Sequence, residues 1–157
     1  MNTQTQRPFL FLFKITLFAF ILSALPFNEV ILDASPFWML LFYAYWLVYF
    51  PVRGSLFIAL ILGVLLDILQ GDILGQNALA LILASVFINN VKQSFYVSNL
   101  STQQVYVFFS SSIYLVFFFL TYSLIHGINS NYYLLLAPLS SALIWPIVRF
   151  LLAKCRH

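Results

Sequence analysis

The sequence predicts an all-α integral membrane protein that consists of a single transmembrane domain, residues 1–157, with six membrane-spanning helices. Hydrophobic residues make up 63% of the chain and charged residues only 7%, whereas soluble domains carry about a quarter charged residues. The mean hydropathy is correspondingly high, at +1.00. Short breaks rich in proline, glycine and polar residues separate the apolar segments. Lysine and arginine fall into alternate breaks, which is typical of a multi-pass membrane protein.

Proline, glycine and polar residues mark the ends of the spans. The second span lies between Pro36 and Pro51 and is short for a span of about 20 residues. A signal peptide is the competing interpretation of the first span, but Lys14 interrupts its apolar run. Only the Gly71–Asp72 turn separates the third span from the fourth, so these two form a tight helical hairpin. The predicted spans are residues 9–26, 37–50, 54–70, 73–89, 105–125 and 132–152.

The positions of the charged residues predict the topology. Every second break is basic, and these breaks contain Arg7, Arg53, Lys92, Lys154 and Arg156. The opposite breaks contain Glu29, Asp33, Asp72 and His126 but no lysine or arginine. Short cytoplasmic loops carry the excess of lysine and arginine, so we expect cytoplasmic N- and C-termini. The net charge of +3 then reflects topology, and no nucleic-acid partner is expected.

Two other segments give expectations about the surface of the protein. Residues 89–104 are polar and are expected to lie along the membrane interface as a short amphipathic linker, or to contact a cytoplasmic partner. The second span is rich in aromatic residues, which we expect in interfacial belts and on the lipid-facing surface.

The third and fourth spans carry the most informative pattern in the chain. Gly63, Asp67 and Gly71 are four residues apart, so they form one stripe on a helix. The fourth span repeats this spacing with Gln76, Ala80 and Ala84, and Asn77 lies beside them. Small residues permit close helix approach, so the stripes are expected to face each other with Gln76 or Asn77 near Asp67. Asp67 lies about 20 Å into a hydrocarbon core of about 30 Å, in its outer half.

Two interpretations of Asp67 remain open from the residues alone. It could be a proton- or ligand-coupled carboxylate of a transporter, because ionisable groups inside membranes are often functional. It could instead cap or hydrogen-bond helix ends near the turn and hold the hairpin in one geometry. The second interpretation is favoured because no relay of ionisable groups accompanies Asp67. His126 could pair with it only if the third and fifth spans meet.

The last span and the absence of catalytic motifs complete the pattern. Ser140–Ser141, Trp145–Pro146 and Arg149 predict a kinked helix with a small, polar docking face, with Arg149 reaching toward the cytoplasmic interface. The chain contains one cysteine and two histidines, and it lacks the GxSxG, P-loop and HExxH motifs. We therefore expect that the protein is not an enzyme and that it has no metal site and no cofactor.

The hairpin sequence Gly63-Val-Leu-Leu-Asp67-Ile-Leu-Gln-Gly71-Asp-Ile-Leu-Gly75-Gln-Asn-Ala78-Leu-Ala resembles the signature of the bacterial rod shape-determining protein MreD family. In that family a GxxxD helix runs through a glycine turn into an LGxxAL helix. The Leu143-Ile-Trp145-Pro146 segment, followed by Arg149, is similar to the family's last span. The candidate hairpin and partner-interface residues are Gly63, Asp67, Gly71, Gly75, Gln76, Asn77, Trp145, Pro146 and Arg149.

The resemblance implies a non-enzymatic scaffold of the elongation (rod) complex in the inner membrane. Family members partner with MreC and, through it, connect MreB filaments to the RodA glycosyltransferase and its penicillin-binding transpeptidase. The hairpin would present its outer-half surface to MreC, and membrane lipid would surround the remaining faces.

The resemblance also defines a rival class. Family members are similar in fold to the substrate-binding subunits of energy-coupling-factor transporters, so a vitamin-type uptake subunit or small transporter that uses Asp67 is the alternative. A protein of that class should have a small-xxx-small coupling face on its first span and a polar ligand cavity. Here Ala19 and Ala24 are five residues apart, and no such cavity can be identified in the sequence.

Overall fold

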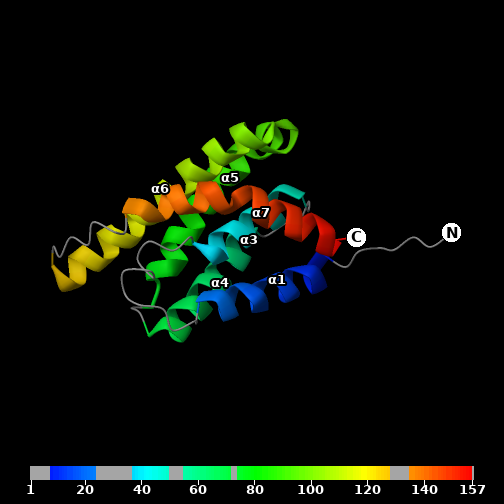
Figure 1. The fold of residues 1–157 in the computed structure, drawn as a ribbon. Helices are drawn as coiled ribbons and strands as arrows, with labels where there is room; N and C mark the ends of the chain where they lie inside the picture. Colours follow the sequence, from blue (N-terminus) through cyan, green and yellow to red (C-terminus); the bar gives the residue numbers. More distant parts are fainter. Residues whose placement is uncertain (1–7, 24–36, 50–54, 72–73, 128–134, 157) are drawn as a thin grey trace.

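The computed structural model describes residues 8–23, 37–49, 55–71, 74–127 and 135–156. Within these ranges the chain forms a bundle of six α-helices (Figure 1): α1 Pro8–Ser23, α3 Trp38–Tyr49, α4 Ser55–Gln70, α5 Gln76–Val97, α6 Leu100–His126 and α7 Ala137–Arg156. Three stretches are long and apolar enough to cross a membrane: Gln76–Val97, Leu100–Ile125 and Ala137–Lys154. The all-α prediction is therefore confirmed, whereas the count of six spans stays a prediction because α1, α3 and α4 are shorter.

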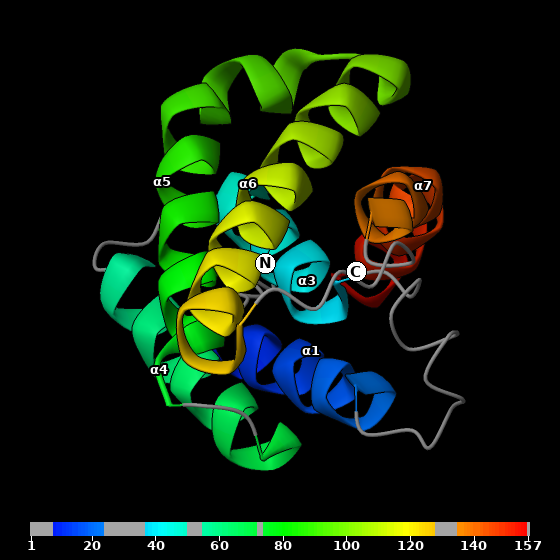
Figure 2. The same cartoon turned by 90° about the vertical axis from the view of Figure 1, so that its left-hand side faces the viewer.

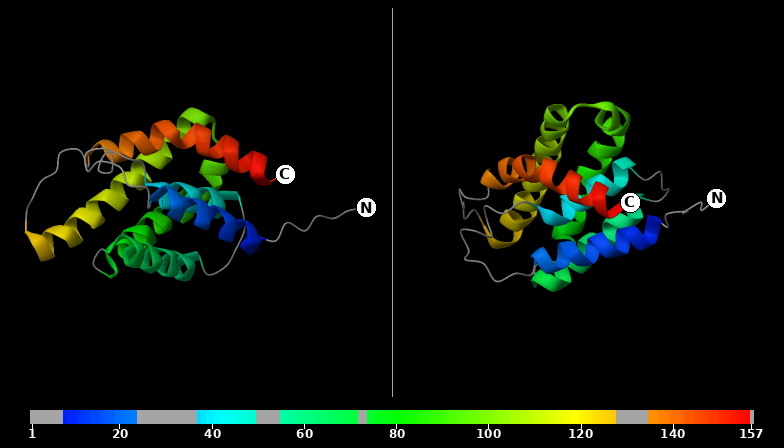
Figure 3. Two further views of the ribbon diagram at one scale, coloured as in Figure 1. Left: turned by 60° about the horizontal axis from the view of Figure 1, so that its bottom comes forward. Right: turned by 45° about the vertical axis from the view of Figure 1, so that its right-hand side comes forward.

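Successive helices alternate in direction. The start of α1 and the end of α7 lie at one end of the bundle, and the α4–α5 turn lies at the other end (Figure 1; Figure 3, left). The α5–α6 connection lies at the top of the views in Figures 1 and 2. The side of the membrane that each end of the bundle faces stays a prediction.

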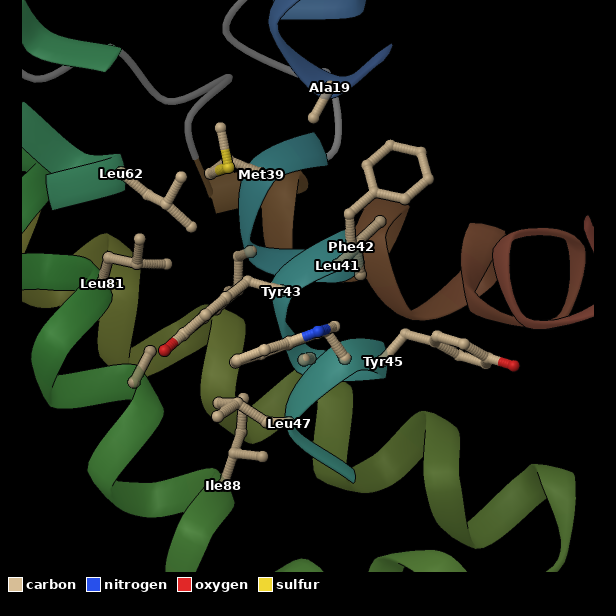
Figure 4. Packing of buried hydrophobic residues seen from close by; sticks show 14 of the residues in the cluster. Ala19, Met39, Leu41, Phe42, Tyr43, Tyr45, Leu47, Leu62, Leu81 and Ile88 are labelled. Carbon is tan, nitrogen blue, oxygen red and sulfur yellow. The ribbon is translucent and has the colours of Figure 1, made fainter. Parts of the chain in front are cut away.

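Helix α3 forms the centre of the bundle. All of its residues from Met39 to Val48 are buried, and it packs against α1, α5 and α7. Figure 4 shows α3 among side chains from neighbouring helices, including Ala19 of α1, Leu62 of α4 and Ile88 of α5. The expectation that its aromatic residues form lipid-facing belts is therefore wrong. The pattern misled because a helix enclosed by other apolar helices has the same composition as one surrounded by lipid.

The polar segment 89–104 is part of two long helices and is not a separate interfacial linker. Helix α5 continues to Val97 and α6 begins at Leu100, so only Ser98–Asn99 interrupts the helical backbone. Figure 2 shows the two helices side by side, joined at the top of the view. The linker expectation is therefore corrected. Polar side chains at the end of a helical hairpin can be hydrated or hydrogen-bonded within the protein, so their presence does not require the helix to stop.

Candidate functional site

The α4–α5 turn depends on two glycines with left-handed backbone conformations. Gly71 has φ 70° and Gly75 has φ 98°, and non-glycine residues adopt such angles only at an energetic cost. A Cβ atom at either position would meet no other atom within 4 Å. Both glycines are therefore required by backbone conformation, and the expectation that Gly71 belongs to the helix-packing stripe is corrected.

Gly63 lies at a close approach of α4 and α5. A Cβ atom at this position would overlap Ala78 Cα and would lie 2.6 Å from the Ala78 backbone nitrogen. Because backbone atoms cannot move aside as a flexible side chain can, even alanine would force the two helices apart. A close approach at Gly63 is present, but the residue that it meets is Ala78 and not a member of the predicted stripe of Gln76, Ala80 and Ala84.

Asp67 is completely buried beside this contact and binds the start of α5. Its Oδ2 accepts a hydrogen bond from the Gly75 N–H at 2.8 Å, and its Oδ1 accepts one from the Asn77 N–H at 2.9 Å. Oδ1 also accepts from the Asn77 side-chain Nδ2 at 2.8 Å. The first N–H groups of a helix have no partner within the helix, and the helix dipole favours a negative charge there. Asp67 thus supplies from α4 the cap that Gly75 cannot supply.

Asn77 extends this contact to a third helix. Its Nδ2 lies 3.3 Å from Gln70 Oε1 of α4, and its Oδ1 accepts a hydrogen bond from the Tyr114 hydroxyl of α6. The neighbouring Gln76 donates from Nε2 to the Phe118 carbonyl of α6 at 3.3 Å. Asp67, Asn77 and Tyr114 form a buried polar network, which we call the hairpin network. It joins α4, α5 and α6.

Tyr114 is the member of this network that the sequence analysis missed. It is one aromatic residue among many in the fifth span, and no spacing rule pairs it with Asn77. The available signal was its hydroxyl, because a buried tyrosine hydroxyl usually finds a hydrogen-bond partner. Its ring also lies against Phe37 before α3, with centroids 4.6 Å apart.

The candidates in the last span lie elsewhere. Trp145 is fully buried and donates from Nε1 to Gln103 Oε1 of α6 at 3.2 Å. Gln103 lies 11 residues before Tyr114, which corresponds to about 16 Å along α6. Pro146 lies inside α7, and Arg149 is half-buried one turn beyond Trp145. The predicted residues therefore form two groups, the hairpin network and a contact between α6 and α7.

The chemistry of the hairpin network is that of a structural contact. Asp67 is the one carboxylate among the described residues, and three N–H donors already bind its two oxygens. No group of three histidine, cysteine or acidic residues in the described ranges could hold a metal ion. The possible pairing of Asp67 with His126 lies outside the described residues, because the His126 side chain is not among them.

Comparison with known proteins identifies the family. The model of the rod shape-determining protein MreD family matches residues 3–155. The rod shape-determining protein MreD of Haemophilus influenzae is 30% identical over 142 residues, which cover 88% of this chain and 86% of that protein. No solved structure matches the chain. Since the family match extends over nearly the whole sequence, this chain belongs to the rod shape-determining protein MreD family.

Proposed function

We propose that this protein is a non-enzymatic scaffold of the elongation complex in the bacterial inner membrane, and that it binds MreC through the α4–α5 hairpin. The family gives the chain a role in rod shape determination, and its long apolar helices make it a membrane protein. RodA, its penicillin-binding transpeptidase and, indirectly, MreB are the further partners that we propose from the family resemblance.

The hairpin network is the observation that carries this proposal. The Asp67 carboxylate caps α5, and Asn77 accepts a hydrogen bond from Tyr114. Buried hydrogen bonds therefore connect α4, α5 and α6. Buried networks that are well satisfied hold helices in one arrangement. A scaffold needs such a fixed surface, because ordering a loose surface on binding reduces affinity.

The outer surface of this hairpin is apolar and exposed. Ile68 and Leu69 at the end of α4 are 61% and 59% exposed, and Leu74 in the turn is 67% exposed. In the predicted topology these side chains lie at the end of the bundle opposite the cytoplasmic termini. We propose that this surface, Ile68, Leu69 and Leu74, receives the membrane span of MreC by apolar packing.

Co-purification tests the proposal. The tagged protein is extracted from bacterial membranes in mild detergent, and the proteins recovered with it are identified by mass spectrometry. We expect MreC with the wild-type chain and a loss of at least tenfold with Ile68→Trp, which changes the shape of the surface but keeps it apolar. Phe150→Trp on the exposed face of α7 is the matched control and should recover MreC normally. Equal recovery of MreC with Ile68→Trp would refute the proposed surface.

The same experiment distinguishes the rival class. Recovery of ATPase subunits and a transporter coupling protein, without MreC, would contradict the scaffold and favour solute uptake. The bonding of Asp67 supports the scaffold, because a carboxylate that caps a helix and accepts three hydrogen bonds is engaged within the fold.

A further inference from the structure

Pro146 leaves a backbone carbonyl in α7 without its usual partner. Proline has no N–H, so it cannot donate to the carbonyl of the residue four positions earlier. That residue is Ala142, and Pro146 lies well inside α7. In a bilayer, where water is absent, a freed carbonyl must be bonded by the protein itself.

A side chain from α6 occupies this position. Gln104 donates from Nε2 to the Ala142 carbonyl at 3.1 Å, across 38 residues of sequence. The carboxamide of Gln104 thus provides an N–H to the one carbonyl of α7 that Pro146 deprives of a donor. The proline break and the glutamine are chemically complementary.

The preceding residue strengthens the same contact. Gln103 is fully buried, and its Oε1 accepts from Trp145 Nε1 at 3.2 Å. Its Nε2 donates to the Phe95 carbonyl at 2.9 Å and lies 3.3 Å from the Ser98 carbonyl. One amide therefore joins the end of α5, the start of α6 and the middle of α7. The Phe95 ring also meets the Trp145 ring edge-on, with centroids 5.4 Å apart.

We infer that Gln104 is a positioning residue that replaces the amide missing at Pro146, and that with Gln103 it fixes the end of the α5–α6 hairpin against α7. We call this contact, Gln103–Gln104 with Trp145–Pro146, the glutamine latch. It holds the end of the polar segment 89–104 against the middle of α7. The inference rests on these contacts alone and is independent of MreC binding.

The latch predicts a specific coupling between Gln104 and Pro146. In the purified full chain in detergent, Gln104→Leu should lower the midpoint of thermal unfolding by about 3–8 °C, because the Ala142 carbonyl loses its donor. Pro146→Ala restores a backbone N–H at that place, so Gln104→Leu should cost less than about 1 °C in the Pro146→Ala background. Gln93→Leu, at an exposed glutamine near the end of α5, is the control and should leave the midpoint unchanged.

A distance measurement reports on position rather than stability. Spin labels at Ser101 of α6 and Phe150 of α7, both exposed, in a Cys155→Ser background, should give one narrow distance distribution. Gln104→Leu should broaden or shift it, and adding Pro146→Ala should restore it. If the Gln104→Leu protein does not accumulate, Gln104→Asn can replace it in both measurements, because the asparagine side chain is one methylene shorter and its amide does not reach as far. The inference would be overturned if Gln104→Leu lowered the unfolding midpoint equally with proline and with alanine at position 146. An unchanged distance distribution in the Gln104→Leu protein would also overturn it.

Discussion

Asp67 and Asn77 form two hydrogen bonds with each other, one through the Asn77 backbone and one through its side chain. A single carboxylate in the last turn of one helix thereby fixes both the start of the next helix and the side chain of its second residue. The contact lies at the turn of a helical hairpin whose two arms touch at Gly63 and Ala78.

Removal of the Asp67 carboxylate should destabilise the hairpin in proportion to the acceptors lost. Asp67→Ala removes the acceptor of the Gly75 and Asn77 backbone N–H groups at the start of α5, and we expect a loss of about 3 kcal/mol in unfolding free energy. Asp67→Asn keeps one oxygen but turns an amide toward the Gly75 N–H, so about half that loss is expected. Chemical unfolding in detergent measures both, with the exposed Asn90→Ala as control. Equal stability of Asp67→Ala and the wild type would contradict the capping role.

Substitution of Gly63 and of Gly75 should destabilise the protein for different reasons, because Gly63 lacks space for a side chain and Gly75 has a left-handed backbone conformation. Gly63→Ala should cost about 2–3 kcal/mol through overpacking against Ala78. Gly75→Asn should be milder than Gly75→Val, because asparagine tolerates the left-handed conformation and a β-branched residue does not. Thermal unfolding of the three variants checks this order. A Gly63→Ala protein as stable as the wild type would show that the helices separate easily.

Tyr114→Phe should reveal that the hairpin network acts as a unit. Loss of the hydroxyl that binds Asn77 should cost about 1 kcal/mol. In an Asn77→Ala background the same change should cost much less, because the acceptor is already gone. The double-mutant cycle in detergent gives the coupling energy. Additive effects would mean that Tyr114 stabilises α6 by packing alone.

Rod shape and solute flux separate the two functional classes. If the scaffold proposal is right, cells that carry Gly63→Leu or Gly71→Leu lose rod shape, whereas Asp67→Asn cells keep most of it. A transporter would show the reverse order, with Asp67→Asn abolishing activity while the protein still folds and binds its partners. Microscopy of complemented cells and proton-dependent flux in liposomes measure the two. Rod shape that survives Gly71→Leu would count against the scaffold.

The sequence predicted the hairpin well because its contacts are local. Gly63, Asp67 and Asn77 lie within 15 residues, so helical periodicity and one tight turn determine which side chains meet. The family resemblance, carried by the same residues, is confirmed by the comparisons.

Contacts between distant helices were not accessible in the same way. Tyr114 lies 37 residues from Asn77, and Gln104 lies 38 residues from Ala142. Nothing in the local pattern indicates which helices become neighbours. The aromatic residues of α3 were misinterpreted for the same reason, since burial by helices and burial by lipid select the same side chains.

The central position of α3 has a consequence for the order of biosynthesis. Its 12 residues extend about 18 Å, less than the hydrocarbon thickness of about 30 Å. Two of the helices that enclose it, α5 and α7, follow it in the chain, and α7 is the last helix of the described residues. Until the ribosome has released α7, one side of α3 lacks its covering. The core around α3 is thus completed only after α7 has been made, and a nascent chain that stops before Ala137 has all of α3 but cannot enclose it.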